Sequence, residues 1–109
     1  MSYFIDDDHP WTELGDGIRR KVVGHTPELM SVLVQFDEGA VGAVHAHDAH
    51  DQIAYVLAGA FEADVGGVKR RLGPGDAFVA PREVPHGVVS LAPGSLLLDQ
   101  FSPRRDDYL

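Results

Sequence analysis

An all-β fold, built as a sandwich or a barrel, is predicted by the amino-acid sequence. Short runs of β-branched and aromatic residues stand between Gly, Pro and Asp residues along most of the chain, a spacing typical of strands joined by tight turns. Helix signals are poor. The one long apolar window without Gly or Pro, Leu29 to Phe36, is rich in Val, and Val favours a strand.

The first predicted strands lie in the N-terminal half of the chain, at Ile18–Gly24, Leu29–Phe36, Gly42–His47 and Gln52–Leu57. In the first of them a basic run alternates between two faces, so either Arg20 alone or Arg19 with Lys21 points inward. We interpret this run mainly as a solvated edge, which discourages pairing with other chains. Glu38 and Gly39 mark the turn after the second strand.

The remaining strands are each bounded by turn residues, and they are predicted at Phe61–Val65, Val68–Leu72, Ala77–Ala80, Pro85–Ser90 and Ser95–Phe101. Gly66 and Gly67 form a tight hairpin between the first two, because glycine accepts a positive φ without a steric penalty. Further turn markers lie at Gly73-Pro74-Gly75 and Pro93-Gly94.

Length and composition restrict the classes of function. A chain of 109 residues is expected to form one domain, residues 1–109, with residues 1–10 as a mobile N-terminal segment. With no cysteine, any metal must be held by His, carboxylate or amide groups. The net charge of −8 argues against nucleic acid and anionic membranes as partners. The start lacks a signal-peptide pattern and no apolar run reaches the length of a membrane helix, so we expect a cytoplasmic protein.

Two histidines on one strand indicate a candidate metal site. His45 and His47 are two residues apart, so in a strand both imidazoles point to the same side. Gln52 lies at an odd offset from His47 and joins the pair only if the intervening turn or bulge resets the register. His86 follows a loop with a proline near each end. Three imidazoles and one amide oxygen suit a divalent transition ion, with Zn, Ni, Fe and Mn all open.

Two motifs containing these residues resemble those of the cupin family. Gly39-x5-His45-x-His47-x4-Gln52-x6-Gly59 is similar to the first cupin motif, and Gly75-x5-Pro81-x-Glu83-x2-His86-x3-Ser90 to the second. The resemblance implies a single cupin barrel, which is a jelly roll or double-stranded β-helix. The chain departs from the motifs at Gln52, Glu83 and Ser90, where cupins usually have Glu, Gly and Asn. A neutral Gln favours a Lewis-acid role over dioxygen chemistry.

The start at Trp11–Lys21 and the tail at Leu98–Leu109 resemble a narrower group, the small cupins of pectin and alginate breakdown. That group converts 4,5-unsaturated monouronates to linear 5-keto-4-deoxyuronates and also has Gln in its first motif. The resemblance extends from about Trp11 to Leu109. The loop between His47 and Gln52 is one residue longer than usual, which is expected to shift Gln52 slightly.

The resemblance also implies roles for individual residues. The metal ligands correspond to His45, His47, Gln52 and His86. By spacing, Asp99, Phe101 and Arg105 match the residues that line the site: Asp99 as the general acid and base, Arg105 as the clamp on the substrate carboxylate and Phe101 as an apolar wall. Arg104 is the rival of Arg105, because Pro103 ends the strand and leaves the tail to place either one.

Simpler interpretations stay open beside these roles. Asp99 could form a structural ion pair and Arg105 could be a solvated tail residue. His50, in the turn, is a candidate substrate contact or a surface residue. As a whole, the chain could instead be another metal-dependent enzyme, such as a different sugar isomerase or a dioxygenase, or a non-enzymatic binding module for a sugar acid. The expected partners are a small anionic sugar acid and a second copy of the chain, as a homodimer paired through an edge strand.

Overall fold

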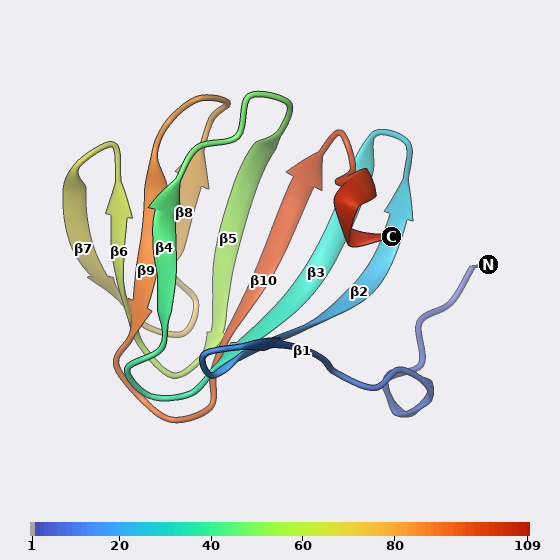
Figure 1. Cartoon of the computed structure of the whole chain (residues 1–109), viewed down its shortest axis with the longest axis horizontal. Coiled ribbons are helices and arrows are strands. Elements are labelled where there is room, and N and C mark those ends of the chain that lie inside the picture. Colours follow the sequence, from blue (N-terminus) through green and yellow to red (C-terminus); the bar gives the residue numbers. More distant parts are fainter. Residues whose placement is uncertain (1) are drawn as a thin grey trace.

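The computed structural model describes residues 2–109, which fold almost entirely into β-strands (Figure 1). The strands in chain order are β1 (Thr12–Gly15), β2 (Ile18–Thr26), β3 (Leu29–Phe36), β4 (Val41–His45), β5 (Asp51–Ala58), β6 (Phe61–Val65), β7 (Val68–Leu72), β8 (Ala77–Ala80), β9 (His86–Ser90) and β10 (Ser95–Ser102). Two short 3₁₀ turns, η1 (Asp6–Asp8) and η2 (Asp106–Tyr108), precede and follow them.

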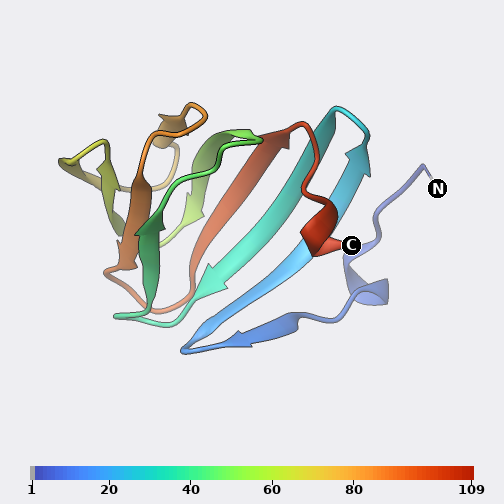
Figure 2. The same ribbon diagram turned by 45° about the horizontal axis from the view of Figure 1, so that its top comes forward.

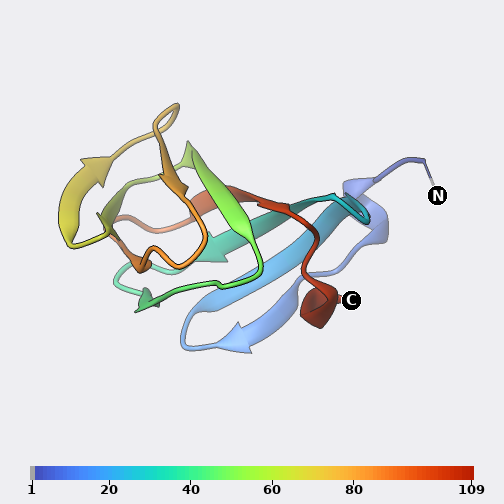
Figure 3. The same ribbon diagram turned by 90° about the horizontal axis from the view of Figure 1, so that it is seen from above.

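The strands form two antiparallel sheets that face each other around one interior (Figures 1 and 2). The larger sheet has the order β1-β2-β3-β10-β5-β8, and the smaller has the order β4-β9-β6-β7. In both, strands far apart in the sequence are neighbours, as in a jelly roll. Seen from above in Figure 3, the chain after β10 turns back toward β2 and ends beside it. The predicted all-β cupin-type barrel is confirmed.

The core lies on the inward faces of both sheets. β3, β5 and β10 alternate between buried and exposed or half-buried residues, the pattern expected when a strand covers a core on one side. Their inward residues include Val32, Ala54 and Val56, all fully buried, and the smaller sheet contributes the fully buried Phe61. The Phe61 ring packs edge-on against Phe36 at a centroid distance of 5.1 Å.

Most predicted strands agree with the structure within two residues. The hairpin at Gly66 and Gly67 is present, with Val65 paired to Val68 and positive φ at both glycines. Two differences matter for the site. β4 ends at His45, so His47 lies in the following loop and its direction does not come from the pleat. The short strand β1 was not predicted; it pairs with β2 and supplies the edge of the sheet, so interpreting Arg19–Lys21 as a solvated edge was wrong.

The N-terminal segment makes specific contacts with the larger sheet. Lys21 points outward from β2 yet is only 8% exposed, because Asp6 and Trp11 cover it. Its Nζ donates to Asp6 Oδ1 at 3.0 Å and lies 4.7 Å from the centroid of the Trp11 ring. Among residues 2–109, no helical segment has the length and apolar character needed to cross a bilayer.

One glycine of the first motif has a clear steric role. Gly59, with φ of 77°, follows β5, and a Cβ built there would lie 2.6 Å from the Cα of Ser95. This distance leaves no room for a side chain at position 59. Ser95 in turn accepts a hydrogen bond from the Ala60 amide at 3.2 Å, which joins this turn to the start of β10. Gly59 therefore aligns β5 with β10, the two strands that carry Gln52 and Asp99.

Candidate metal centre

Three imidazoles meet at the end of the barrel where β4 finishes and β9 begins; that of His86 is buried, that of His47 is half-buried and that of His45 is exposed. His45 is the last residue of β4 and pairs in register with His86, the first residue of β9. His47 reaches the same place from the loop between β4 and β5. The three side chains each offer a ring nitrogen, and these atoms all lie within 4.8 Å of one another. The His45 and His47 Nε2 atoms are 3.1 Å apart.

Backbone carbonyls orient two of the three rings. His45 Nδ1 lies 2.7 Å from the Ala43 carbonyl oxygen, and His86 Nδ1 lies 3.0 Å from that of Val84. A carbonyl only accepts, so each Nδ1 must carry the proton and donate it. In the neutral ring this leaves a lone pair on Nε2, the atom that faces the centre. In many metal sites a histidine ligand is oriented in this way, by a hydrogen bond from its other ring nitrogen to a carbonyl or carboxylate.

Gln52 completes the cluster from the opposite sheet. It is 6% exposed and lies on the inward face of β5, although its offset from His47 is odd. The loop at residues 46–50 resets the register, as the metal-site hypothesis required. Gln52 Oε1 lies 3.0 Å from His86 Nε2. Since His86 donates through Nδ1, two lone pairs face each other there.

The arrangement of these donor atoms fits a bound cation. Two lone pairs at hydrogen-bond distance repel each other unless a positive charge lies between or beside them. Ligand atoms about 2.1 Å from one ion are spaced about 3.0 Å apart at octahedral angles and about 3.4 Å apart at tetrahedral angles, and the separations here are 3.1 Å and 3.0 Å. Three imidazoles and one amide oxygen are ligands that suit a divalent transition ion.

The surroundings also favour the neutral, metal-binding form of two of the imidazoles, those of His47 and His86. Burial, together with the smaller effects of the positive charges of Arg105 and the neighbouring histidines, lowers the pKa of His47 to about 4. Burial likewise lowers the pKa of His86, partly opposed by its bond to Val84. Neutral imidazole is the ligand form, so a metal ion that binds His47 and His86 near pH 7 displaces no proton from these two rings.

Asp99 lies beside this cluster on the inward face of β10. It pairs in register with Val32 and Ala54, both fully buried. Its Oδ1 is buried and has no hydrogen-bond partner among the described residues. Burial raises the pKa of the Asp99 carboxyl to about 7, although the Gln52 amide and Arg105 act in the opposite direction. A carboxyl with this pKa is present in both protonation states near neutrality.

Phe101 and Arg105 lie next to the cluster, whereas Arg104 does not. The Phe101 ring is 2% exposed and packs edge-on to His47 at a centroid distance of 6.0 Å. Arg105 Cζ lies 5.2 Å from the Phe101 centroid, and its charge influences both His47 and Asp99. Arg104 instead contacts Asp106 and His25, and His25 lies near the C-terminal end of β2. The structure thus brings together all the sequence-predicted site residues.

Two further residues near the site, Tyr108 and Arg20, were not assigned a role from the sequence. Tyr108 packs edge-on to Phe101 with centroids 5.8 Å apart, and Arg20 Cζ lies 3.8 Å from the Tyr108 centroid. Strand parity left the direction of Arg20 open, and nothing in the sequence indicated that the tail would cover it. His50 Nδ1 lies 3.0 Å from the Pro103 carbonyl oxygen. This contact ties the loop after His47 to the tail.

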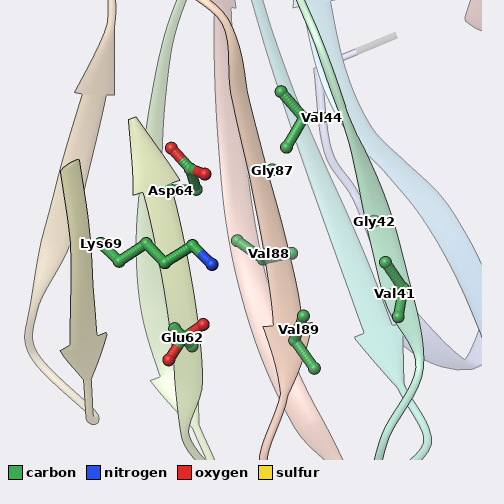
Figure 4. Close-up of a pocket in the computed structure, with 9 residues that line it drawn as sticks. All are labelled: Val41, Gly42, Val44, Glu62, Asp64, Lys69, Gly87, Val88 and Val89. Atoms are coloured by element: carbon green, nitrogen blue, oxygen red, sulfur yellow. The ribbon is translucent and has the colours of Figure 1, made fainter. Parts of the chain in front are cut away.

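A separate hollow of about 120 Å³ lies on the outer face of the smaller sheet (Figure 4). Lys69 extends from β7 across β6, with Glu62 and Asp64 on either side of its amino end (Figure 4). The other lining residues are apolar or glycine: Val41, Gly42, Val44, Gly87, Val88 and Val89. None of the three histidines of the cluster lines this hollow, so it belongs to the charged outer surface of the barrel and not to the metal centre.

Comparisons with known proteins extend over the whole chain. The family described as "Cupin domain" matches residues 32–98. The pectin degradation protein KdgF of Dickeya dadantii (strain 3937) is 57% identical over 107 residues, which cover 98% of this chain and 97% of that protein. The structure of KdgF from Halomonas sp. is 59% identical, with a TM-score of 0.98, and the match covers 100% of this chain and 99% of that one.

A further solved structure supports the same fold. An RmlC-like cupin from Shewanella frigidimarina NCIMB 400 is 39% identical, with a TM-score of 0.95 and coverage of 100% of this chain and 96% of that chain. Asp99, Phe101 and Arg105, which lie beside the histidine cluster, fall within the aligned region of each of these full-length matches.

Proposed function

This chain belongs to the cupin family, and from that membership we propose that it is a metal-dependent enzyme of pectin breakdown, which converts 4,5-unsaturated monouronates to linear 5-keto-4-deoxyuronate. The observation that carries the proposal is the buried Asp99 carboxyl beside a convergent set of three imidazoles and one amide. The similarity to pectin degradation proteins supports the same class of substrate.

His45, His47, His86 and Gln52 would hold the metal ion, and we propose one of Zn, Ni, Fe or Mn. Such an ion supplies a Lewis acid that binds substrate oxygens and stabilises negative charge as it develops. All four protein ligands are neutral, so the net positive charge of the site is retained. An acidic protein needs this local positive charge to bind an anion.

The chain's own residues would move the proton and orient the substrate. The reaction is an isomerisation: the C1 hydroxyl loses its proton, the bond from C1 to the ring oxygen breaks, and C1 becomes an aldehyde. The ring oxygen becomes the hydroxyl of an enol at C5, whose proton is lost while C4 gains one, leaving a ketone at C5. Asp99 is suited to accept and return these protons because its pKa of about 7 populates both forms.

Arg105 and Phe101 would place the reacting ring against Asp99. The Arg105 guanidinium binds the substrate carboxylate through parallel N–H donors. The Phe101 ring is buried beside His47 and provides an apolar surface for one face of the sugar. Together they would hold C4 and C5 near the carboxyl of Asp99, because both project from the same end of β10 or the tail that follows it.

The test is an absorbance assay with unsaturated galacturonate and the metal-loaded protein. Loss of ultraviolet absorbance from the C4=C5 bond should be faster than the spontaneous rate. Asp99→Asn should slow it by about 10²–10⁴-fold while binding of the saturated sugar acid D-galacturonate survives. No acceleration by fully loaded wild-type protein would reject the proposal, and binding without turnover would favour a sugar-acid binding module.

A homodimer and a cytoplasmic location complete the proposal. Both rest on the sequence interpretation alone. Sedimentation velocity of the purified chain measures the first, and fractionation of cells that produce it measures the second. A single species with the mass of one chain across a concentration series would contradict the dimer.

A further inference from the structure

Arg105 already uses three of its N–H groups within the tail. Its Nε donates to Asp107 Oδ1 at 3.3 Å and its Nη2 to Asp107 Oδ2 at 2.8 Å, while Nη1 donates to the Tyr108 hydroxyl at 2.8 Å. A guanidinium has five N–H donors. One N–H on Nη1 and one on Nη2 are therefore left for a ligand.

Resting on the proposed function, we propose that Asp107 and Tyr108 are positioning residues for Arg105, which leave its remaining Nη1 and Nη2 donors to bind the substrate carboxylate. The Asp107 carboxylate accepts hydrogen bonds from one edge of the planar Arg105 guanidinium. The Tyr108 hydroxyl accepts a third hydrogen bond and so restricts rotation of the Arg105 side chain. A substrate anion then meets a guanidinium that is already oriented, so little side-chain entropy is lost on binding.

The Tyr108 ring is itself held in place from several sides. Arg20 Cζ lies 3.8 Å and Arg105 Cζ 4.1 Å from its centroid, and Phe101 packs against it edge-on. The Tyr108 amide also donates to the Arg105 carbonyl at 3.2 Å, which closes the turn of η2. Two cations near one aromatic ring are each favourable. The contact with Arg20 anchors the tail on the inward face of β2.

The neighbouring Arg104 shows how an arginine is placed when it pairs with an aspartate but does not lie beside the site. It also pairs with an aspartate two residues later, at 2.8 Å between its Nε and Asp106 Oδ1. Its side chain is 34% exposed, against 16% for Arg105, and it extends toward His25. The two Arg–Asp pairs thus share spacing and chemistry, but only that of Arg105 lies against Phe101.

This contrast supplies a matched experiment. The variants are Asp107→Asn and Tyr108→Phe, which keep size and ring packing, with Asp106→Asn as the control pair. Calorimetry measures the binding of D-galacturonate and of its methyl ester, which lacks the negative charge, to each Zn²⁺-loaded protein. Wild type and Asp106→Asn should favour the acid by about tenfold or more, and the ratio should fall about fivefold in each test variant and toward one in the double variant.

A second readout needs neither metal nor turnover. In ¹⁵N NMR spectra of the metal-free protein, the Arg105 Nε–H signal should be protected from exchange, and Asp107→Asn should remove that protection while Asp106→Asn leaves it. An unchanged ratio of affinities in folded test variants would overturn the proposal, as would a wild type with no preference for the acid. Because binding is measured directly, these results are independent of whether wild type turns over the unsaturated substrate.

Discussion

Gln52 is a neutral amide at a position where the first cupin motif usually has Glu, and its neighbour Asp99 explains what this difference achieves. The two side chains share the inward surface of β5 and β10. A carboxylate at position 52 would place a second acid beside the buried Asp99. With Gln, Asp99 is the one carboxyl on that inner surface, and its proton is controlled chiefly by burial.

Asp99 should give the metal-free protein a distinctive pH dependence. Its pKa is about 7 folded and near 3.8 unfolded, so the folded state binds the proton more tightly and stability falls as pH rises through this range. Relative to wild type, Asp99→Asn should gain about 3 kcal/mol between pH 5 and pH 8. Urea unfolding with a chelator at both pH values measures this gain.

Because the stability of Asp99→Asn is compared with that of wild type at each pH, the contribution of the histidines to the pH dependence cancels. The lowered pKa of His47 acts in the opposite direction and stabilises the folded state as pH rises, but both proteins contain it. A constant difference in stability between wild type and Asp99→Asn across this pH range would show that Asp99 is ionised in the folded state.

His47 should be essential for metal binding because it supplies one of the convergent nitrogens from a loop. His47→Ala leaves two imidazoles and the amide, and removal of one ligand should lower the affinity for Zn²⁺ at least about 100-fold. Equilibrium dialysis followed by elemental analysis measures the bound metal. His25→Ala, which removes an imidazole that contacts Arg104, is the matched control and should bind one ion per chain as wild type does.

Among the elements, the loop between β8 and β9 carries a local strain that the second motif predicts. Glu83 has φ of 69°, in the left-handed region where the motif usually has Gly. Its amide donates to the His47 carbonyl oxygen. The loop that leads to His86 therefore also supports the loop that carries His47, and the strained residue lies at the point of contact.

Glu83→Gly should relieve this strain and stabilise the protein by about 0.5–1 kcal/mol, the gain being limited by the greater freedom of glycine in the unfolded chain. Chemical denaturation measures the difference. Glu83→Ala is the matched control, because alanine also disfavours positive φ, and it should give no gain. Equal stabilisation by both substitutions would assign the effect to the lost charge and not to the backbone.

For the molecule as a whole, the candidate centre joins the two sheets. Gln52 belongs to the larger sheet, whereas His45 and His86 belong to the smaller one. A metal ion bound by all of them would act as a cross-link across the barrel, in addition to the shared apolar core.

Metal binding should therefore raise the stability of the entire fold. Because the unfolded chain does not hold the ligands together, free Zn²⁺ at 100 times its dissociation constant should add about 2.7 kcal/mol. Calorimetric melting with Zn²⁺ and with excess chelator gives the difference in Tm. At the same free Zn²⁺ concentration, His47→Ala should gain no more than about 0.4 kcal/mol, and a Tm of wild type that does not depend on metal would contradict a cross-link.

Much of this protein could be predicted from local pattern. The alternation of apolar residues in β3 and β5, the glycines at the hairpin and the motif spacing of His45, His47, Gln52 and His86 are properties of neighbouring residues. The alternation and the hairpin follow from the two-residue period of a strand and the freedom of glycine, which act over a few positions, whereas the four candidate ligands were predicted from the resemblance to the two cupin motifs. These patterns were sufficient to predict the barrel and the side chains that the structure brings together at the candidate metal centre.

Other features depend on which distant segments come into contact. Arg20 points inward and meets Tyr108 because the tail returns across β2, and β1 pairs with β2 although its four residues carry little strand signal. The selection of Arg105 over Arg104 and the burial that raises the pKa of Asp99 arise in the same way. The desolvation of Asp99, the cation–π contact of Arg20 and the pairing of β1 with β2 each depend on residues that are brought together only when the chain folds. Local sequence pattern therefore does not predict them.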